Sequence, residues 1–317
     1  MRYRELGNTG LRVSEVALGT VELGLNYGFT GSAHYQRPAP AESIKLIRRA
    51  VELGINLIDT ARAYGDSESL IGQALQGLSP RPYIASKVYL PDELKTGDLR
   101  SLRRTIVTSI ETSLKELRID TLDLIQIHNT KAETMHCEEV FAVLDELKDR
   151  GLVRLLGASS ATRGESVPLE IIKSGLVSVL QAPFNLLDQV LARSVFPQAA
   201  LGGTGVLVRS AFLRGVLTNQ VNSIPERLTP LREGALAVLR VLGTEVESLS
   251  EAALRFCLSF PAVSSVITGI RSISELETNL AAAARGPFSN EVLANLAHIN
   301  IDDEKIIDTT QWRDLTT

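Results

Sequence analysis

Residues 122–127 read Leu122-Asp123-Leu124-Ile125-Gln126-Ile127, a short run in which four of the six side chains are aliphatic. A strand that is covered on both faces has such a nearly continuous apolar run, whereas a strand that faces water on one side alternates apolar and polar residues. Covered strands are typical of parallel sheets whose strands are connected through helices. The run therefore predicts a buried strand in an α/β fold.

Similar runs recur along the chain, and longer amphipathic segments separate them. Eight strands are predicted, at Glu15–Thr20, Asn56–Ala61, Tyr83–Val88, Leu122–Ile127, Val153–Ser159, Val177–Ala182, Gly205–Ser210 and Ser264–Gly269. Helices are predicted between them, including Ala41–Leu53, Ser67–Leu75, Leu99–Leu117, Cys137–Arg150 and Leu249–Phe260. Gly54 and Gly151 follow two of these helices and are typical stop signals.

Eight strand-helix units in 317 residues favour a (β/α)8 TIM barrel, with the whole chain, residues 1–317, as one domain. A flat, doubly wound sheet would also alternate in this way. The barrel is favoured because no shift in composition marks a second domain, and because polar motifs follow successive strands. Before the first strand, Gly7-Asn8-Thr9-Gly10 predicts an N-terminal β-hairpin that would close the barrel floor.

Three long stretches without a regular pattern follow predicted strands. They are Glu22–Pro40, Thr130–His136 and Leu213–Pro230. A barrel carries its substrate-binding loops at this end of its strands. We therefore expect these stretches to surround the binding site.

The bulk composition excludes several classes of protein. Apolar residues make up 44% and charged residues 22%, which is close to the globular average. A net charge of −4 gives no general attraction to nucleic acid or to an acidic membrane. The first residues lack an apolar signal core, and no window reaches the roughly 18 apolar residues of a spanning helix, so a cytoplasmic protein is expected. Cys137 and Cys257 lack metal-ligand spacing and are expected to be free thiols, with no metal site.

Four side chains with acid-base chemistry follow three neighbouring predicted strands. Asp59 ends one strand and Tyr64 comes five residues later. Lys87 ends the next strand, and His128 follows the strand after that. Because the carboxyl ends of barrel strands converge on one mouth, the four side chains are expected to meet there.

Each of these residues also has an ordinary structural interpretation. An aspartate after a strand commonly caps a turn, a tyrosine commonly packs, and a histidine beside an apolar strand is commonly a hydrogen-bonded core residue. Lys87 differs, because a buried amine requires a charge partner. Asp59 on the adjacent strand can supply that charge.

Together the four residues indicate a proton donor. A phenol has a pKa of about 10, and lowering it by about three units requires roughly 4 kcal/mol. Lys87 is expected to lower the pKa of Tyr64, Asp59 to keep Lys87 charged and in place, and His128 to orient a substrate oxygen. Hydride attack on a carbonyl carbon would accompany proton donation by Tyr64, and the reverse reaction would oxidise an alcohol.

Three motifs resemble the aldo-keto reductase superfamily. The stretch Gly54–Glu68 with Gly72 is similar to the family signature, and Ile84–Lys87 and Asp123–His128 are similar to its partner motifs. The resemblance spans nearly the whole chain. It implies a barrel that transfers a hydride between a nicotinamide cofactor and a carbonyl or alcohol carbon.

The resemblance also implies an extended dinucleotide site across the barrel mouth, and the chain has no Rossmann-type glycine fingerprint. Arg209 stands where many relatives carry an aromatic residue that stacks on the nicotinamide, and a guanidinium plane can also stack. Ser159 and Gln181 match positions near the carboxamide, and Thr20 and Asp59 match positions near the nicotinamide ribose. The implied cofactor residues are Thr20, Asp59, Ser159, Gln181, Arg209, Ser210, Leu213, Gly215, Gly269, Arg271, Glu275 and Asn279.

The segment 267–279 resembles the part that binds the adenosine end of the cofactor, and it contains opposing signals. Arg271 would pair with a 2′-phosphate. Glu275 occupies a position that is often Arg or Gln, where it would repel that phosphate and accept from a ribose hydroxyl instead. Both charges also have an ordinary interpretation as helix-start residues. NADP is favoured over NAD because the family mostly uses the phosphorylated form.

The substrate is expected to be a small carbonyl or alcohol compound, bound by the long loops. The candidate lining residues are Tyr27, Phe29, Tyr35, Tyr89 and Asn129, with Trp312 folding over them. An aromatic content of 5% favours a small aldehyde or sugar over a bulky steroid.

Two classes of function stay open: a reductase or sugar dehydrogenase, and a nucleotide-binding regulatory subunit that senses cofactor redox state. Cofactor consumption with a panel of carbonyl compounds distinguishes them. Nothing in the sequence points to a particular oligomeric state.

Overall fold

Eight parallel strands close into a barrel in the computed structural model, which describes residues 1–30, 35–90, 99–161 and 163–312. Around the barrel the strands follow the order β10, β3, β4, β5, β6, β7, β8, β9. Their bounds are β3 Val16–Gly19, β4 Leu57–Asp59, β5 Tyr83–Val88, β6 Leu122–Thr130, β7 Val153–Ser160, β8 Val179–Pro183, β9 Gly205–Arg209 and β10 Val263–Gly269. The predicted (β/α)8 barrel is confirmed, and the flat sheet is excluded.

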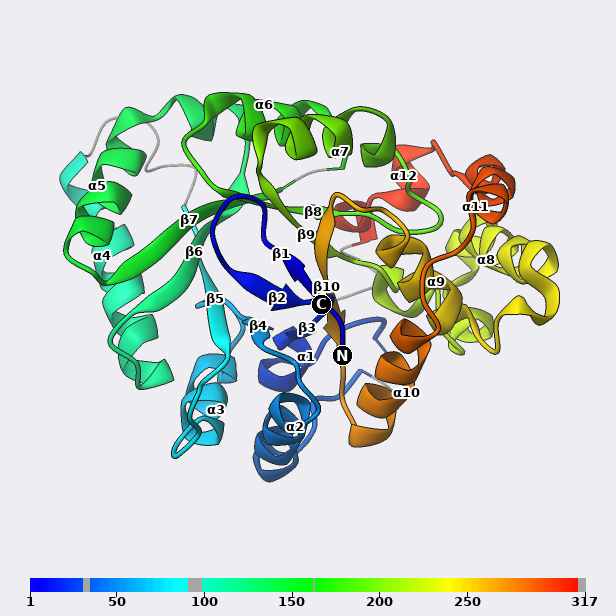
Figure 1. Cartoon of the computed structure of the whole chain (residues 1–317), viewed down its shortest axis with the longest axis horizontal. Coiled ribbons are helices and arrows are strands. Elements are labelled where there is room, and N and C mark those ends of the chain that lie inside the picture. Colours follow the sequence, from blue (N-terminus) through cyan, green and yellow to red (C-terminus); the bar gives the residue numbers. More distant parts are fainter. Residues whose placement is uncertain (31–34, 91–98, 162, 313–317) are drawn as a thin grey trace.

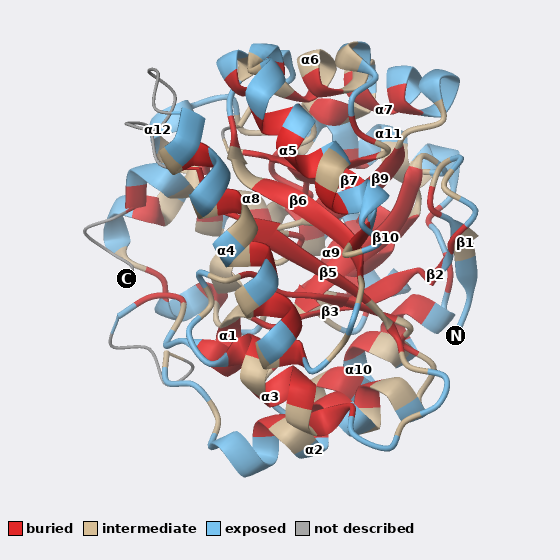
Figure 2. Ribbon diagram, turned by 90° about the vertical axis from the view of Figure 1, so that its left-hand side faces the viewer, coloured by how far each residue is buried: buried red, intermediate tan, exposed pale blue. Residues whose placement is uncertain are grey.

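Helices surround the barrel (Figure 1). Their bounds are α1 Val21–Gly24, α2 Pro40–Glu52, α3 Ser67–Ala74, α4 Leu99–Leu117, α5 Glu138–Asp149, α6 Ser166–Ser174, α7 Leu191–Gly202, α8 Thr229–Leu242, α9 Leu249–Leu258, α10 Ile273–Ala284, α11 Asn290–Leu296 and α12 Glu304–Ile307. Their inner faces and the strands are buried, whereas their outer faces are exposed (Figure 2). No helix in the described ranges is long and apolar enough to cross a membrane.

The structure differs from the prediction in two ways near the site: the end of one strand, and the content of the stretches predicted to be irregular. His128 lies inside β6, which continues to Thr130 after a shift in its pairing with β7, so it does not follow the strand as predicted. The stretches predicted to be irregular contain short 3-10 helices, at Ala132–His136 (η2), Leu213–Gly215 (η3), Val221–Ser223 (η4) and Glu226–Leu228 (η5). Cys137 and Cys257 are free thiols, as predicted.

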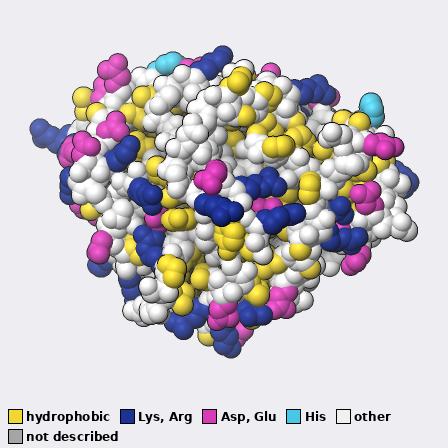
Figure 3. Space-filling model, viewed as in Figure 1, with side chains coloured by type: hydrophobic (Ala, Val, Ile, Leu, Met, Phe, Trp, Pro, Cys, Tyr) yellow, Lys and Arg dark blue, Asp and Glu magenta, His cyan; other side chains and the backbone are white. Residues whose placement is uncertain are grey.

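The predicted N-terminal hairpin is present and closes the barrel floor. Strands β1 (Tyr3–Glu5) and β2 (Arg12–Ser14) pair antiparallel. Leu6, Leu11 and Val13 are fully buried and belong to one apolar cluster with the lower interior of the barrel. On the face of the molecule that carries this hairpin, basic and acidic side chains are interspersed (Figure 3).

The barrel interior changes character along seven of its eight strands. Its lower ring, against the hairpin, is apolar and contains Ala17, Leu57, Ala85, Leu124, Val179, Leu207 and Ile267. Side chains two residues apart on a strand point to the same face. Two residues further on, the same strands carry Gly19, Asp59, Lys87, Gln126, Gln181, Arg209 and Gly269. The same alternation therefore builds an apolar floor and a polar mouth.

Candidate active site

Asp59, Lys87 and Tyr64 meet at the barrel mouth, as the sequence predicts. Lys87 Nζ lies 2.6 Å from Asp59 Oδ2 and donates at 2.9 Å to the carbonyl oxygen of Thr60. The same nitrogen is 3.5 Å from the Tyr64 hydroxyl and 4.9 Å from the centroid of its ring. The Lys87 side chain has no exposure to solvent. Its charge is thus balanced by a carboxylate in direct contact.

Amide groups on two other strands, β8 and β6, hold the Asp59 carboxylate. Gln181 Nε2 donates to Asp59 Oδ1 at 2.8 Å, and Gln126 Nε2 approaches the same oxygen at 3.4 Å. Thr20 donates its hydroxyl to the backbone carbonyl of Asp59 at 2.8 Å. Asp59 is therefore fixed from three strands or strand ends, and it in turn fixes Lys87. Gln126 was not among the predicted site residues.

His128 completes the group and is uncharged at neutral pH. Its ring stands nearly perpendicular to that of Tyr64, with the centroids 5.6 Å apart. Burial, and then the positive charges of Lys87 and Arg209, lower the pKa of His128 to about 3. Its Nδ1 is buried and has no hydrogen-bond partner within the described residues. A neutral imidazole donates from one ring nitrogen, which suits it to orient an oxygen.

The predicted net lowering of the pKa of Tyr64 is wrong for the protein without a cofactor. Burial and the nearby Asp59 carboxylate raise the pKa of Tyr64 well above its ordinary value, and Arg209 is the cation that opposes this increase. Burial also lowers the pKa of Lys87, against the effect of Asp59. Tyr64 is consequently a protonated phenol across the physiological pH range.

A cavity of about 800 Å³ opens beside these residues. Every residue that the resemblance implies for the cofactor lines it: Thr20, Asp59, Ser159, Gln181, Arg209, Ser210, Leu213, Gly215, Gly269, Arg271, Glu275 and Asn279. The structure thus brings together positions from the first and last barrel strands. This cavity, here called the groove, is lined by Tyr64 as well as by Glu275 and Asn279 of α10.

The substrate candidates divide into two groups. Tyr27, Phe29, Tyr89 and Asn129 line the cavity, whereas Tyr35 is not among its lining residues. Asn129 is held in place by hydrogen bonds in both directions with the Leu90 backbone, at 3.1 and 2.8 Å. Trp312 is buried and stacks on Phe29 with ring centroids 5.7 Å apart. The tail residue therefore supports the cavity wall through Phe29.

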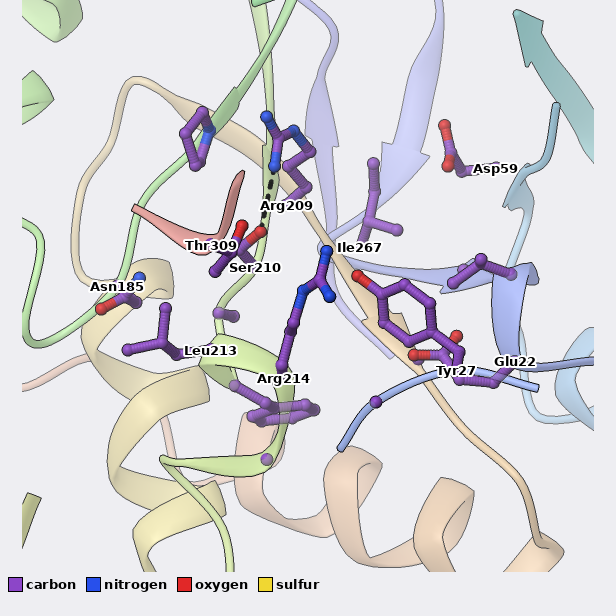
Figure 4. Close-up of a pocket in the computed structure, with 18 of the residues that line it drawn as sticks. Glu22, Tyr27, Asp59, Asn185, Arg209, Ser210, Leu213, Arg214, Ile267 and Thr309 are labelled. Carbon is purple, nitrogen blue, oxygen red and sulfur yellow. Dashed lines mark hydrogen bonds between the residues drawn. The ribbon is translucent and has the colours of Figure 1, made fainter. Parts of the chain in front are cut away.

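The loop after β9 crosses toward the opposite wall of the cavity. Ser210, Leu213 and Arg214 all have positive φ, between 45° and 61°, which non-glycine residues rarely adopt. The Arg214 guanidinium lies 5.0 Å from the centroid of the Tyr27 ring (Figure 4). Such backbone strain concentrates at ligand-binding segments, because surrounding structure must stabilise it.

Glu275 has a structural role that the sequence presents only as an alternative. It is the third residue of α10, and its Oε2 accepts from the Arg271 backbone nitrogen at 2.7 Å. Ser272 caps the same helix by accepting from the Glu275 backbone nitrogen. The Arg271 side chain donates through Nη2 to the Tyr27 carbonyl at 2.7 Å. Both charged side chains nevertheless line the cavity.

One buried cavity residue escaped prediction altogether. Glu22, in α1, is 9% exposed, and its Oε2 has no hydrogen-bond partner within the described ranges. The sequence places it at the start of an irregular stretch, where a glutamate is expected to face solvent. Its carboxylate lies against Gly269 at the end of β10, and no local sequence pattern reports a contact so distant along the chain.

A sequence model of the Aldo/keto reductase family matches residues 15–301. The chain belongs to this family. It is an oxidoreductase, because the family's general reaction is hydride transfer with a nicotinamide cofactor.

Similar proteins include other members of the family. An uncharacterized oxidoreductase of Bacillus subtilis, YqkF, is 29% identical over 95% of this chain and 98% of its own length. The L-galactose dehydrogenase of Arabidopsis thaliana is 29% identical over 89% of this chain and 88% of its own length. The holo form of an aldo-keto reductase from Bacillus halodurans superposes with a TM-score of 0.78 at 26% identity, covering 95% and 97% of the two chains.

The cavity fits an extended dinucleotide. Three polar atoms on residues that line it, Glu22 Oε2, His128 Nδ1 and Arg271 Nε, are buried without a hydrogen-bond partner in the described part of the chain. Buried polar groups in folded proteins are nearly always satisfied, so these atoms indicate a polar ligand. The volume of the cavity, about 800 Å³, lies in the range of cofactor and ligand pockets.

Proposed function

We propose that this protein reduces the carbonyl group of a small aldehyde, ketone or sugar with NADPH, and that Tyr64 is the general acid. The observation that carries the proposal is the contact of Lys87 with Asp59 and Tyr64 at the edge of the cavity. When bound, the nicotinamide supplies the hydride. Tyr64 donates its hydroxyl proton to the substrate oxygen, and Lys87 stabilises the phenolate that remains.

The acid-base properties of the site support reduction as the favoured direction. Tyr64 has a raised pKa and therefore holds its proton until substrate oxygen becomes basic. Alcohol oxidation requires the deprotonated phenolate, which burial disfavours. The neutral His128 donates a hydrogen bond to the same substrate oxygen without competing as an acid.

The cofactor is proposed to lie along the groove from Tyr64 to α10. Thr20, Ser159, Gln181 and Arg209 would hold its nicotinamide end. Ser210, Leu213, Gly215 and Gly269 would follow the pyrophosphate, and Arg271, Glu275 and Asn279 would hold the adenosine end. Tyr27, Phe29, Tyr89 and Asn129 would border the substrate.

The test is direct consumption of the reduced cofactor. Purified protein is mixed with NADPH or NADH and a panel of small aldehydes, ketones and sugars, and absorbance at the nicotinamide band is followed. Turnover with at least one carbonyl compound is expected. Tight cofactor binding with no consumption across the panel would contradict the proposal and favour the regulatory class.

We expect Glu275→Arg to raise the ratio of kcat/KM for NADPH over NADH about tenfold, which corresponds to about 1.4 kcal/mol. The variant removes a carboxylate that repels a 2′-phosphate and supplies a guanidinium that pairs with one. Glu275→Gln is the control, because it keeps an acceptor for the Arg271 backbone nitrogen and removes only the charge. An unchanged ratio in both variants would show that this position does not select the cofactor.

A further inference from the structure

One oxygen of the buried Glu22 carboxyl group lacks a hydrogen-bond partner in the described part of the chain. This atom is Oε2, and the Glu22 side chain lines the cavity. An unsatisfied buried polar atom costs about 1–3 kcal/mol, and more when it is charged. A folded protein retains such a group where a ligand completes it, as at binding sites.

The position of the carboxyl group is fixed by the carboxyl end of β10. A Cβ atom at Gly269 would lie 2.0 Å from Glu22 Oε1, so only glycine leaves room for this side chain. Thr20, Gly269 and Arg271 line the same cavity as Glu22. Tyr64 and Glu275 of α10 line it too, so a ligand that fills this cavity can contact Glu22.

The charged groups around Glu22 are those of an anion site. Arg271 and Arg214 both attract a negative charge there, and Glu275 opposes it. Figure 4 shows Glu22 and Tyr27 on one side of the pocket and Arg214 reaching toward them from η3. Tyr64 also interacts electrostatically with Glu22. Burial outweighs the two arginines and raises the pKa of Glu22.

We propose that Glu22 is a dinucleotide-binding residue whose carboxyl group takes up a proton from solvent, keeps it, and donates a hydrogen bond through Oε2 to an anionic oxygen of the diphosphate. This inference rests on the proposed nicotinamide cofactor. The proton neutralises a carboxylate that would otherwise repel the ligand. It also converts an unpartnered acceptor into a donor, while Arg214 and Arg271 face the same anion.

A definite pH dependence follows. The bound anion raises the pKa of Glu22 further. Binding therefore takes up protons at each pH at which Glu22 is ionised in the free protein and protonated in the complex. Affinity is then highest at low pH. It falls as pH rises above the pKa of the free protein, by up to about tenfold per pH unit until the pKa of the complex is reached.

The test is calorimetric titration of the full chain with NADH and with ADP-ribose between pH 6 and 9.5. These ligands lack the 2′-phosphate of NADPH, which would itself titrate at a pH of about 6. Each titration is repeated in two buffers of different ionisation enthalpy, which gives the number of protons taken up. We expect uptake approaching one proton with both ligands, and dissociation constants that rise with pH.

Two variants assign the proton. Glu22→Gln keeps the shape of the side chain and is expected to abolish uptake and flatten the pH dependence. Glu277→Gln is the control, because it makes the same change in α10 at a residue that pairs with Arg49 and is not among the residues lining the cavity, and it is expected to leave uptake intact. Uptake that survives in Glu22→Gln, or binding to the unaltered protein without uptake, would overturn the inference and leave the proposed cofactor standing. Failure of every dinucleotide to bind would overturn the proposed function as well.

Discussion

Replacement of Tyr64 with phenylalanine is expected to lower kcat about 100- to 10,000-fold and to leave the dissociation constant of the cofactor nearly unchanged. The hydroxyl is the proton donor in the proposed reaction, and a positioned general acid contributes about that factor. The ring would remain beside Lys87 and His128, so the cavity keeps its shape. Single-turnover kinetics would measure the chemical step, and a fluorescence titration with NADPH would measure binding.

Tyr83→Phe is the matched control, because it makes the same chemical change at the start of β5, against the apolar floor cluster. We expect its kcat to stay within about twofold of the unaltered protein, as for a substitution remote from the reacting atoms. If Tyr64→Phe and the unaltered enzyme have comparable kcat values, Tyr64 is not the general acid.

Replacement of Lys87 with methionine is expected to lower the free energy of unfolding by about 3–5 kcal/mol, besides abolishing activity. Lys87 and Asp59 are in direct contact, with 0% and 5% of their side chains exposed. Removing the ammonium leaves a buried carboxylate held only by neutral amide donors. Urea unfolding at neutral pH would give the free energies.

A double-mutant cycle with Asp59→Asn would separate this charge effect from the loss of packing. Lys87→Met with Asp59→Asn leaves neither charge unpaired, so we expect the double variant to lose clearly less stability than the sum of the single variants. Additive losses would mean that the two groups are not coupled. If Lys87→Met lowers the free energy of unfolding by less than about 1 kcal/mol, the pair contributes no more than an exposed ion pair does. That result would contradict the large effect expected from its burial.

Much of the site could be predicted because its chemistry follows strand periodicity. Asp59 and Lys87 lie near the carboxyl ends of adjacent strands that share a register, so the sequence indicates their contact before any coordinates are known. The barrel and its hairpin follow from patterns of the same local kind. The prediction for His128 differs from the structure in one respect: it places His128 after the strand, whereas β6 continues past it to Thr130.

Other properties depend on long-range packing, which a sequence pattern does not report. The direction of the pKa shift of Tyr64 is set by how much water the fold removes from its hydroxyl. The position of Glu22 requires a glycine at the end of β10, near the other end of the chain. The structural role of Gln126, which approaches the Asp59 carboxylate from β6, appears only when the barrel brings β4 and β6 together around β5.

The two rings inside the barrel have a consequence for engineering. Successive side chains that point into the barrel are two residues apart along a strand, which is about 6.6 Å. This distance separates the apolar ring at the barrel floor from the ring that carries Asp59 and Lys87. Hydrophobic substitutions in the apolar ring that conserve total volume generally keep a fold intact. Redesign of the barrel floor that conserves its volume is therefore expected to leave the fold, and with it the groups at the mouth, in place.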